Sequence, residues 1–553
     1  MIVKNKLVLV VILTIAAILR LWNLDTNPPH LYSDEAAIGY NAYSILKTGR
    51  DEHGEFLPIV FKSFGDWKPG LYIYSTVPFI ATLGLSELSV RLPSAIAGIV
   101  AVFLLYLLAK ELFKNEKIAF LISLCLALTP WHIHFSRGAW EANLSLTILL
   151  GGTLCFVKSI SGKKKYLLPG AILFALTLWT YQGAKLASLI VLGILTYTYR
   201  KPLLEINRKL ATTTILMGII LTLPILLSLI DGKAGRLSVY SLFSYERPPE
   251  SIDRILSQEG VSRNSWQYKL YHTETLSFVR GLTGRWVNHY SGRFLFFEGD
   301  WSNPRHQAPE TGMLLLIQLP LLLLGTFILV RQKDTKAISF ILLWLILAPL
   351  PAALSRDSVH AVRSFNLVIP LAVLTGLGVW GITEFLQKQK KKVAFPISAA
   401  LCCIFILNYW YYLDNYFVHY PKRNAQAWLY GYKEVIGAIN KKNYDEVIFQ
   451  QSYNQPYMFF LFYKKYDPEK YQATSRKYYE ENPYGDVGKI SRLDNISFRN
   501  ATESDLHKPG TLIIFDPETP PYPAILEEHR GGEVGEVKRP NGSTAFRILK
   551  FSE

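Results

Sequence analysis

Apolar blocks of about twenty residues recur along this chain, separated by short charged connections, and no other feature constrains the fold as strongly. Of the 553 residues, 50% are hydrophobic and only 18% are charged. A helix of about twenty residues crosses the ~30 Å hydrocarbon core of a bilayer. The pattern predicts an α-helical polytopic membrane protein with about eleven spans. They are Leu7–Trp22, Val90–Leu112, Ile118–Phe135, Leu144–Val157, Tyr166–Thr180, Ala184–Tyr199, Leu210–Ile230, Met313–Val330, Ile338–Leu354, Val362–Leu386 and Val393–Tyr412.

The charged connections predict how these spans are oriented in the cell membrane. Lysine-rich connections such as Lys110–Lys117 and Lys388–Lys392 alternate with connections that carry acids, histidines and tryptophans. Because positive residues accumulate on the cytoplasmic side, the N-terminus is predicted to be cytoplasmic. No small-residue cleavage site ends Leu7–Trp22, so this span is predicted to be retained. The outward regions are then Asn23–Ser89, His132–Asn143, Asp231–Gly312 and everything after Tyr412.

Two regions outside the spans have a structure of their own. The segments Glu35–Leu46 and Gly70–Leu85 read as surface helices in the first outward loop, because a crossing by the second would reverse every later connection. Residues 1–412 are thus predicted to form the transmembrane domain, with outward loops 23–89 and 231–312.

Residues 413–553 are more polar, with candidate buried strands at Glu446–Gln450 and Thr511–Phe515, and we expect a small extracytoplasmic α/β domain there. Its role is open between binding an acceptor and passively covering the site.

Charge and cysteine content exclude several function classes. The formal net charge of +16 is interpreted as the ordinary cationic bias of the inner connections rather than as a nucleic-acid surface. All four cysteines fall inside apolar spans, so the sequence indicates neither a disulfide framework nor a cysteine metal site. We therefore expect the lipid bilayer, and no nucleic acid, as a partner.

The first outward loop carries the residues best suited to catalysis. A carboxylate pair, Asp34 and Glu35, follows the first span by about a dozen residues, and Lys68 stands near the far end of the loop. A carboxylate at the membrane surface can deprotonate a hydroxyl, and a lysine can neutralise a phosphate. An equally simple interpretation is that Ser33 caps a surface helix with both acids in its first turn. Both interpretations can hold together.

The second outward connection contains histidines and an opposite-charge pair. His132 and His134 could ligate a metal if a strand held them on one side, but on a helix they diverge, and no third ligand has a recognisable spacing. Arg137 and Glu141 are spaced to pair on one helical face. Charges at membrane depth are costly and often functional, although a structural ion pair is the simpler alternative.

Further cations stand at the outer ends of other spans, namely Arg91, His360 and Arg363. Each could merely extend its charge to the membrane interface. If Arg91, Arg363, Arg137 and Lys68 lie on one outward face, they predict a bound anion at bilayer level, such as a lipid phosphate.

These motifs together resemble the polyprenyl-phosphate-dependent glycosyltransferases of the GT-C superfamily, in the branch of protein O-mannosyltransferases and aminoarabinose (lipid A) transferases. The resemblance rests on Ser33-Asp34-Glu35, Lys68-Pro69, Arg91-Leu92-Pro93-Ser94 and the Arg137 to Glu141 element, and covers residues 1–200 best. It implies a GT-C fold, a sugar donor linked to a polyprenyl phosphate and a hydroxyl acceptor at the outer face. The acceptor class stays open between protein, glycolipid and cell-envelope glycan.

The resemblance also implies roles for individual residues. Asp34 is the expected base, with Glu35 as a second base or an orienting group. Lys68, together with Arg91, Arg137 and Arg363, is expected to bind the donor phosphate. Glu141 stands where the family commonly has aspartate and is expected to position the site, as are His134 and His360. No cofactor is expected, and a divalent metal is an open alternative that the sequence does not favour.

The expected activity is therefore that of a hexosyl- or pentosyltransferase. A transporter or flippase of a lipid-linked saccharide is the alternative, since it would also need outward cations and many spans, although the inverted repeats common in transporters are not visible. A receptor or scaffold is a third class, and the charges at membrane depth argue against it.

Overall fold

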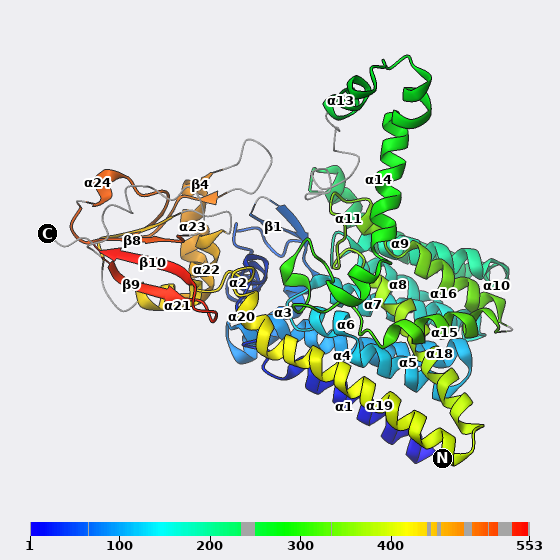
Figure 1. The fold of residues 1–553 in the computed structure, drawn as a ribbon. Coiled ribbons are helices and arrows are strands. Elements are labelled where there is room, and N and C mark those ends of the chain that lie inside the picture. The colour runs from blue at the N-terminus through cyan, green and yellow to red at the C-terminus, as the bar shows by residue number, and fades with distance from the viewer. Residues whose placement is uncertain are drawn as a thin grey trace. The chain divides into compact units, whose positions relative to one another are not determined.

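The computed structural model describes residues 2–64, 66–233, 249–332, 334–439, 444–450, 455–480, 489–506, 508–517 and 533–550. Residues 234–248 of the predicted outward loop 231–312 lie outside this set. The chain forms two compact units. Unit 1 comprises Met1–Leu13, Ala101–His132 and Ser145–Tyr409, and unit 2 comprises Thr14–Val100, Ile133–Leu144 and Trp410–Glu553. The helical unit 1 and the mixed helix and strand content of unit 2 can be followed in Figure 1.

Helices dominate the described residues, as the apolar blocks predict. Six of them are long and apolar enough to cross a membrane by length and composition. They are Glu87–Phe113, Glu141–Ile160, Arg208–Ile230, Thr335–Ala353, Phe365–Gln387 and Lys391–Arg423, and shorter apolar helices are Leu71–Leu83, Ala184–Thr198 and Gln318–Val330.

One predicted span is interrupted. Residues Ile118–Phe135 were expected to be continuous, but α5 (Glu116–Leu128) ends before Pro130 and the short α6 (Pro130–Phe135) begins there. The intervening Thr129 has extended backbone angles, with φ −69° and ψ 124°. A residue that precedes proline is disfavoured in the helical region because the proline ring collides with it, which explains the break.

Close helix contacts hold unit 1 together. Helix α18 (Val368–Gln387) packs against α15 (Gln318–Val330) and α5. A Cβ atom on Gly325 or Gly378 would collide with the backbone of Leu374 or Leu321, so only glycine permits this approach. Further pairs in this unit are α8 with α11 and α9 with α16, and Figure 1 labels all of them. Their bounds are Leu167–Thr177 (α8), Ala184–Thr198 (α9), Arg208–Ile230 (α11) and Thr335–Leu347 (α16); α13 (Pro249–Glu259), α14 (Glu274–Asn288) and α17 (Leu350–Ala353) also belong here.

The predicted outward loop 23–89 belongs to unit 2. It contains α2 (Ser33–Thr48), the antiparallel hairpin of β1 (Val60–Ser63) and β2 (Asp66–Pro69), and α3 (Leu71–Leu83). The two surface helices predicted for this loop are thus present as helices. Helix α2 ends at Gly49, whose φ of 68° is the left-handed conformation that glycine adopts without a Cβ penalty.

The C-terminal residues of unit 2 form a mixed six-stranded sheet in the described part of the chain, in the order β6-β7-β3-β8-β10-β9. Strand β3 is parallel to β7 and β8, whereas β10 is antiparallel to β8 and β9. Strands β8, β10 and β9 can be followed side by side in Figure 1. The strands predicted at 446–450 and 511–515 are β3 and β8. The bounds are Glu446–Phe449 (β3), Arg492–Leu493 (β6), Ile496–Phe498 (β7), Thr511–Phe515 (β8), Glu533–Lys538 (β9), Thr544–Lys550 (β10), Tyr432–Ile439 (α21), Pro456–Tyr463 (α22) and Pro468–Tyr478 (α23).

The first loop and the sheet share one hydrophobic core within unit 2. Helix α2 packs against both α3 and α22. A Cβ atom on Gly39 would lie 2.5 Å from the ring of Phe462, so α22 approaches α2 closely at this point. The side chain of Gln472 donates hydrogen bonds to Ser44 Oγ at 3.0 Å and to the Asp51 carbonyl at 2.9 Å. The C-terminal residues are therefore grouped with the first outward loop.

Candidate functional site

Asp34 and Lys68 form an ion pair in unit 2. Asp34 lies in the first turn of α2, and Lys68 lies on β2, where it is opposite Phe61 of β1. The Asp34 side chain is 50% exposed and that of Lys68 is 14% exposed. The pair therefore presents an accessible carboxylate beside a largely enclosed ammonium group, as a base and a phosphate ligand would require.

Glu35, the neighbouring acid, has different surroundings. Its carboxylate accepts hydrogen bonds from the Arg91 side chain at 3.2 and 3.3 Å. It also accepts from the backbone N–H of Tyr32 at 3.1 Å, in a capping box, and from that of Ala139 at 2.7 Å. Glu35 is buried, and its oxygens are occupied by protein donors. The two adjacent acids are thus separated by environment, with Asp34 accessible and Glu35 holding three segments of chain together.

Arg91 is fully buried and donates from every nitrogen of its guanidinium group. Two bonds reach Glu35, and the others reach the carbonyl oxygens of Leu24 at 3.1 Å, Pro28 at 2.9 Å and His30 at 2.7 Å. These contacts match the five N–H donors of an arginine. Arg91 therefore fixes the path of the first loop over α2, and its binding of a donor phosphate stays a prediction.

The expected helical pairing of Arg137 with Glu141 is wrong, because α6 ends at Phe135 and α7 (Glu141–Ile160) begins only at Glu141. Arg137 lies in the turn between them. Its guanidinium group donates to the carbonyls of Leu19 at 2.9 Å, Trp22 at 2.6 Å, Asn23 at 3.1 Å and Asn27 at 2.9 Å. Glu141 occupies the first turn of α7, where an acid matches the helix dipole.

His134 and His132 diverge, as expected for a helix. His134 is buried, and its ring packs edge-on against Tyr416 and Tyr420 in unit 2, with centroids 5.8 and 5.5 Å away. His132 instead stacks on Phe365 in unit 1, with centroids 5.8 Å apart. The two imidazoles therefore do not share a metal site.

His30 is a residue that sequence reasoning missed. It is buried, its Nδ1 bonds to the Leu31 carbonyl at 2.7 Å, and its Nε2 lies 3.3 Å from both the Lys433 backbone nitrogen and the Tyr463 hydroxyl. Burial lowers the pKa of His30 to about 4, so the imidazole is neutral at pH 7. Its carbonyl binds Arg91, so His30 joins the C-terminal residues to the Arg91 cluster. No sequence pattern predicts that His30 contacts residues more than 400 positions later in the chain.

Two further acids are buried close to this site. Glu52 is fully buried, and Asn41 Nδ2 donates to its Oε1 at 3.2 Å. Burial raises the pKa of Glu52 to about 8 and that of Asp51 to about 6. The nearby positive charge of Lys68 opposes the shift of Glu52 without cancelling it. Glu52 is therefore mostly protonated at pH 7.

Glu52→Gln is expected to raise stability at high pH and to leave it nearly unchanged near pH 5. Between the ordinary glutamate pKa of 4.5 and about 8, native Glu52 holds a proton that the unfolded chain has lost, so the free energy of unfolding falls as pH rises through this window. Glutamine mimics the protonated acid and removes this dependence. Thermal unfolding of the detergent-purified chain from pH 5 to 9 measures it. The exposed Glu55→Gln is the control, and parallel pH profiles for wild type and Glu52→Gln would contradict the prediction.

The predicted site residues Arg363 and His360 lie in unit 1. Arg363 forms an ion pair with Asp357 at 2.8 Å and is largely buried. Its backbone N–H donates to His360 Nδ1 at 3.3 Å. The two residues thus share one connection, which precedes α18.

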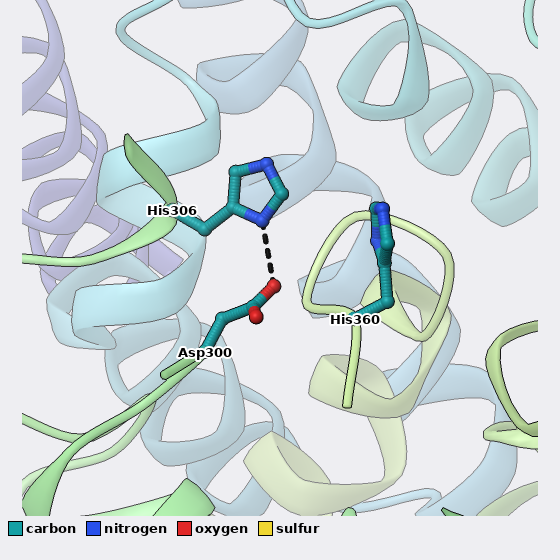
Figure 2. Close-up of side chains that lie close together, drawn as sticks. All are labelled: Asp300, His306 and His360. Carbon is teal, nitrogen blue, oxygen red and sulfur yellow. Dashed lines mark hydrogen bonds and ion pairs between the residues drawn. The ribbon is translucent and has the colours of Figure 1, made fainter. Parts of the chain in front are cut away.

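A cluster of metal-ligating side chains also lies in unit 1. Asp300, His306 and His360 each offer one ligand atom, all within 4.8 Å of one another. Figure 2 shows the Asp300 carboxylate directed toward the space between the two imidazoles. Burial lowers the pKa of both histidines well below the ordinary value and raises that of Asp300. Sequence reasoning named His360 but missed Asp300 and His306, whose only signal is their occurrence in the predicted outward loop 231–312.

Comparisons with known proteins agree with these observations. Residues 10–200 match the family described as dolichyl-phosphate-mannose-protein mannosyltransferase. A putative mannosyltransferase, YycA from Bacillus subtilis, is 30% identical over 156 residues, which are 27% of this chain. The chain covers 22% of the length of that relative. The segment matched by the family model, residues 10–200, contains Asp34, Glu35, Lys68, Arg91, Arg137 and Glu141.

The structural comparisons extend over nearly the whole chain. The crystal structure of ArnT from Cupriavidus metallidurans superposes with a TM-score of 0.54 at 12% identity, over 98% of this chain and 97% of that one, both in the apo state and bound to undecaprenyl phosphate. The archaeal oligosaccharyltransferase AglB from Archaeoglobus fulgidus, in complex with an inhibitory peptide and a dolichol-phosphate, has a TM-score of 0.52 at 13% identity, over 98% and 74%. These matches show that the chain shares its fold with these proteins.

Proposed function

We propose that this chain is a membrane glycosyltransferase that moves a sugar from a polyprenyl-phosphate carrier to an acceptor hydroxyl at the outer face of the membrane. The observation that carries the proposal is the ion pair of Asp34 with Lys68. It lies inside the segment matched by the mannosyltransferase family. The likeness to a structure that binds undecaprenyl phosphate supports a lipid-phosphate carrier.

The proposed reaction is an in-line displacement at the anomeric carbon. The acceptor oxygen forms a bond to that carbon while its bond to the carrier phosphate oxygen breaks, and Asp34 takes the proton of the acceptor hydroxyl. Lys68 stabilises the negative charge that develops on the departing phosphate. Because Asp34 and Lys68 are in contact, a phosphate bound to Lys68 would bring the anomeric carbon close to the base.

The remaining predicted site residues divide into two groups in this proposal. Lys68 and Arg363 are kept as ligands of the donor phosphate. Arg91 and Arg137 position the site, since their hydrogen bonds to carbonyl oxygens of the first loop and, for Arg91, to Glu35 support that role better than binding a phosphate. The remaining positioning residues in this proposal are Glu35, Glu141, His134 and His360.

The membrane arrangement is part of the proposal. About eleven spans, a cytoplasmic N-terminus and an extracytoplasmic C-terminal α/β region would put Asp34 and Lys68 on the outer side. The C-terminal residues are proposed to contribute to acceptor binding, because they pack against the helix that carries Asp34. The sugar is a hexose or a pentose, and the acceptor is a protein, a glycolipid or a cell-envelope glycan.

The test is a transfer assay with the full chain in proteoliposomes. Undecaprenyl and dolichyl phosphates carrying labelled mannose, glucose or aminoarabinose are offered with membrane extracts as the source of acceptors. We expect label from at least one donor to become covalently attached to an acceptor. If no donor labels an acceptor while a lipid-linked sugar crosses the bilayer, the chain is a flippase and the proposal fails.

Lys68→Ala is expected to weaken donor binding about 10- to 100-fold, the range of one charge-assisted hydrogen bond. Lys68→Arg should recover part of the loss, because it keeps the positive charge. The measurement is the KM for the polyprenyl-phosphate sugar. Lys62→Ala, on the paired strand β1 of the same hairpin, is the matched control, and an equal KM for wild type and Lys68→Ala would remove Lys68 from the phosphate site.

A further inference from the structure

Asp300 is the only acid that is buried among the described residues of unit 1. It is fully buried, and its Oδ2 accepts from His306 Nδ1 at 2.6 Å and from the backbone N–H of Ala361 at 2.8 Å. Its Oδ1 is also buried, and Asn303 is a further side-chain donor to the carboxylate. Buried carboxylates are costly unless cations or donors satisfy them, so a cation held between this carboxylate and the two imidazoles would stabilise the cluster.

The residues around this carboxylate are those that bind a transition metal. The imidazole rings of His306 and His360 lie 5.2 Å apart between centroids, and their side chains are 3% and 12% exposed. Zinc is bound by histidine nitrogens and carboxylate oxygens at about 2.0–2.2 Å, with ligand atoms therefore up to about 4 Å apart. In this structure the three candidate ligand atoms lie within 4.8 Å of one another, slightly farther apart than around a bound zinc ion.

Contacts outside the three side chains hold two of the candidate ligands in place. His289 Nε2 accepts the backbone N–H of His360 at 3.1 Å, while the other His289 nitrogen bonds to the Arg285 carbonyl at 2.8 Å. Gln307 Oε1 accepts the backbone N–H of Asp300 at 3.1 Å. Such outer partners orient metal ligands in known sites.

We propose that Asp300, His306 and His360 form a zinc site that ties the outward loop before α15 to the connection before α18. Two imidazoles and one carboxylate favour zinc over magnesium or calcium, which prefer oxygen ligands. The zinc would take three protein ligands and a fourth ligand such as water, and the burial of the site supports a role in stabilising the fold. It fixes the connection that also carries Arg363, three residues after His360. The proposal is independent of which sugar, if any, the chain transfers.

Metal content of the purified full chain tests the proposal. After removal of metal with EDTA and dialysis against zinc, wild type is expected to retain about one zinc ion per chain and to melt at a higher temperature than in EDTA. Asp300→Asn and His306→Gln are expected to lower zinc affinity at least about tenfold. His272→Gln is the matched control, since His272 pairs with Glu259 in the same outward loop at a more exposed position.

Asp300→Asn keeps an acceptor for the Ala361 N–H, so its melting temperature in EDTA should equal that of wild type in EDTA. If the variants do not fold, cobalt substitution of wild type decides the question, because a tetrahedral nitrogen and oxygen site gives intense visible absorption that zinc abolishes. Wild type that retains no stoichiometric zinc, variants that retain as much as wild type, or a cobalt form without that absorption would each overturn the zinc site.

Discussion

Replacing Asp34 with asparagine is expected to lower the rate of sugar transfer by about 10²- to 10⁴-fold, the usual contribution of a positioned general base. Asparagine has nearly the same shape but cannot accept the proton of the acceptor hydroxyl. It also removes the negative partner of Lys68, whose ammonium group would then be more available to the phosphate. We therefore expect a fall in kcat with little change or a decrease in the KM for the donor.

The matched control is Asp25→Asn, an exposed acid in the same loop, which should transfer at the wild-type rate. Single-turnover transfer from a saturating polyprenyl-phosphate donor separates the chemical step from binding. Full activity of Asp34→Asn would exclude Asp34 as the base. It would leave open whether the chain is a glycosyltransferase, because the family match does not depend on the role of this one residue.

Replacing Glu35 with alanine is expected to destabilise the folded chain by about 3–5 kcal/mol, the cost of leaving one partner of a buried ion pair without the other. Arg91 would keep its bonds to three carbonyls but lose its hydrogen-bonded carboxylate partner, and the backbone N–H of Ala139 would lose its acceptor. Glu35→Gln should cost less, since the amide oxygen still accepts one or two of these bonds.

Unfolding in increasing SDS, followed by circular dichroism in mixed micelles, measures the change in free energy. Glu55→Ala, at an exposed position of the same loop, should change stability by no more than about 0.5 kcal/mol. A loss of activity in Glu35→Ala without any loss of stability would instead support the earlier idea of Glu35 as a second base.

Local patterns in the sequence predicted what depends on local physics. The apolar blocks predicted the helices, because a helix that crosses a bilayer needs about twenty apolar residues. Glu35–Leu46 and Gly70–Leu85 were predicted as surface helices, and α2 and α3 occupy Ser33–Thr48 and Leu71–Leu83. One predicted span was wrong for a physical reason, because the ring of Pro130 ends α5 early. Arg137 therefore does not share a helix with Glu141.

Interactions between distant residues could not be predicted. Two adjacent acids look alike in sequence, and only the fold shows that Glu35 meets Arg91 while Asp34 meets Lys68. The same holds for His30, whose ring nitrogen meets residues 403 and 433 positions away. Nothing in the sequence spacing of Asp300, His306 and His360 indicates that their side chains lie close together.

The shared core of α2 and α22 has a consequence for how the chain is made. Helix α2, at Ser33–Thr48, is synthesised before all the helices that separate it from α22, at Pro456–Tyr463. Ring atoms of Phe462 can therefore reach Gly39 only after those intervening helices have been made. Until α22 emerges, the helix that carries Asp34 stays without this packing.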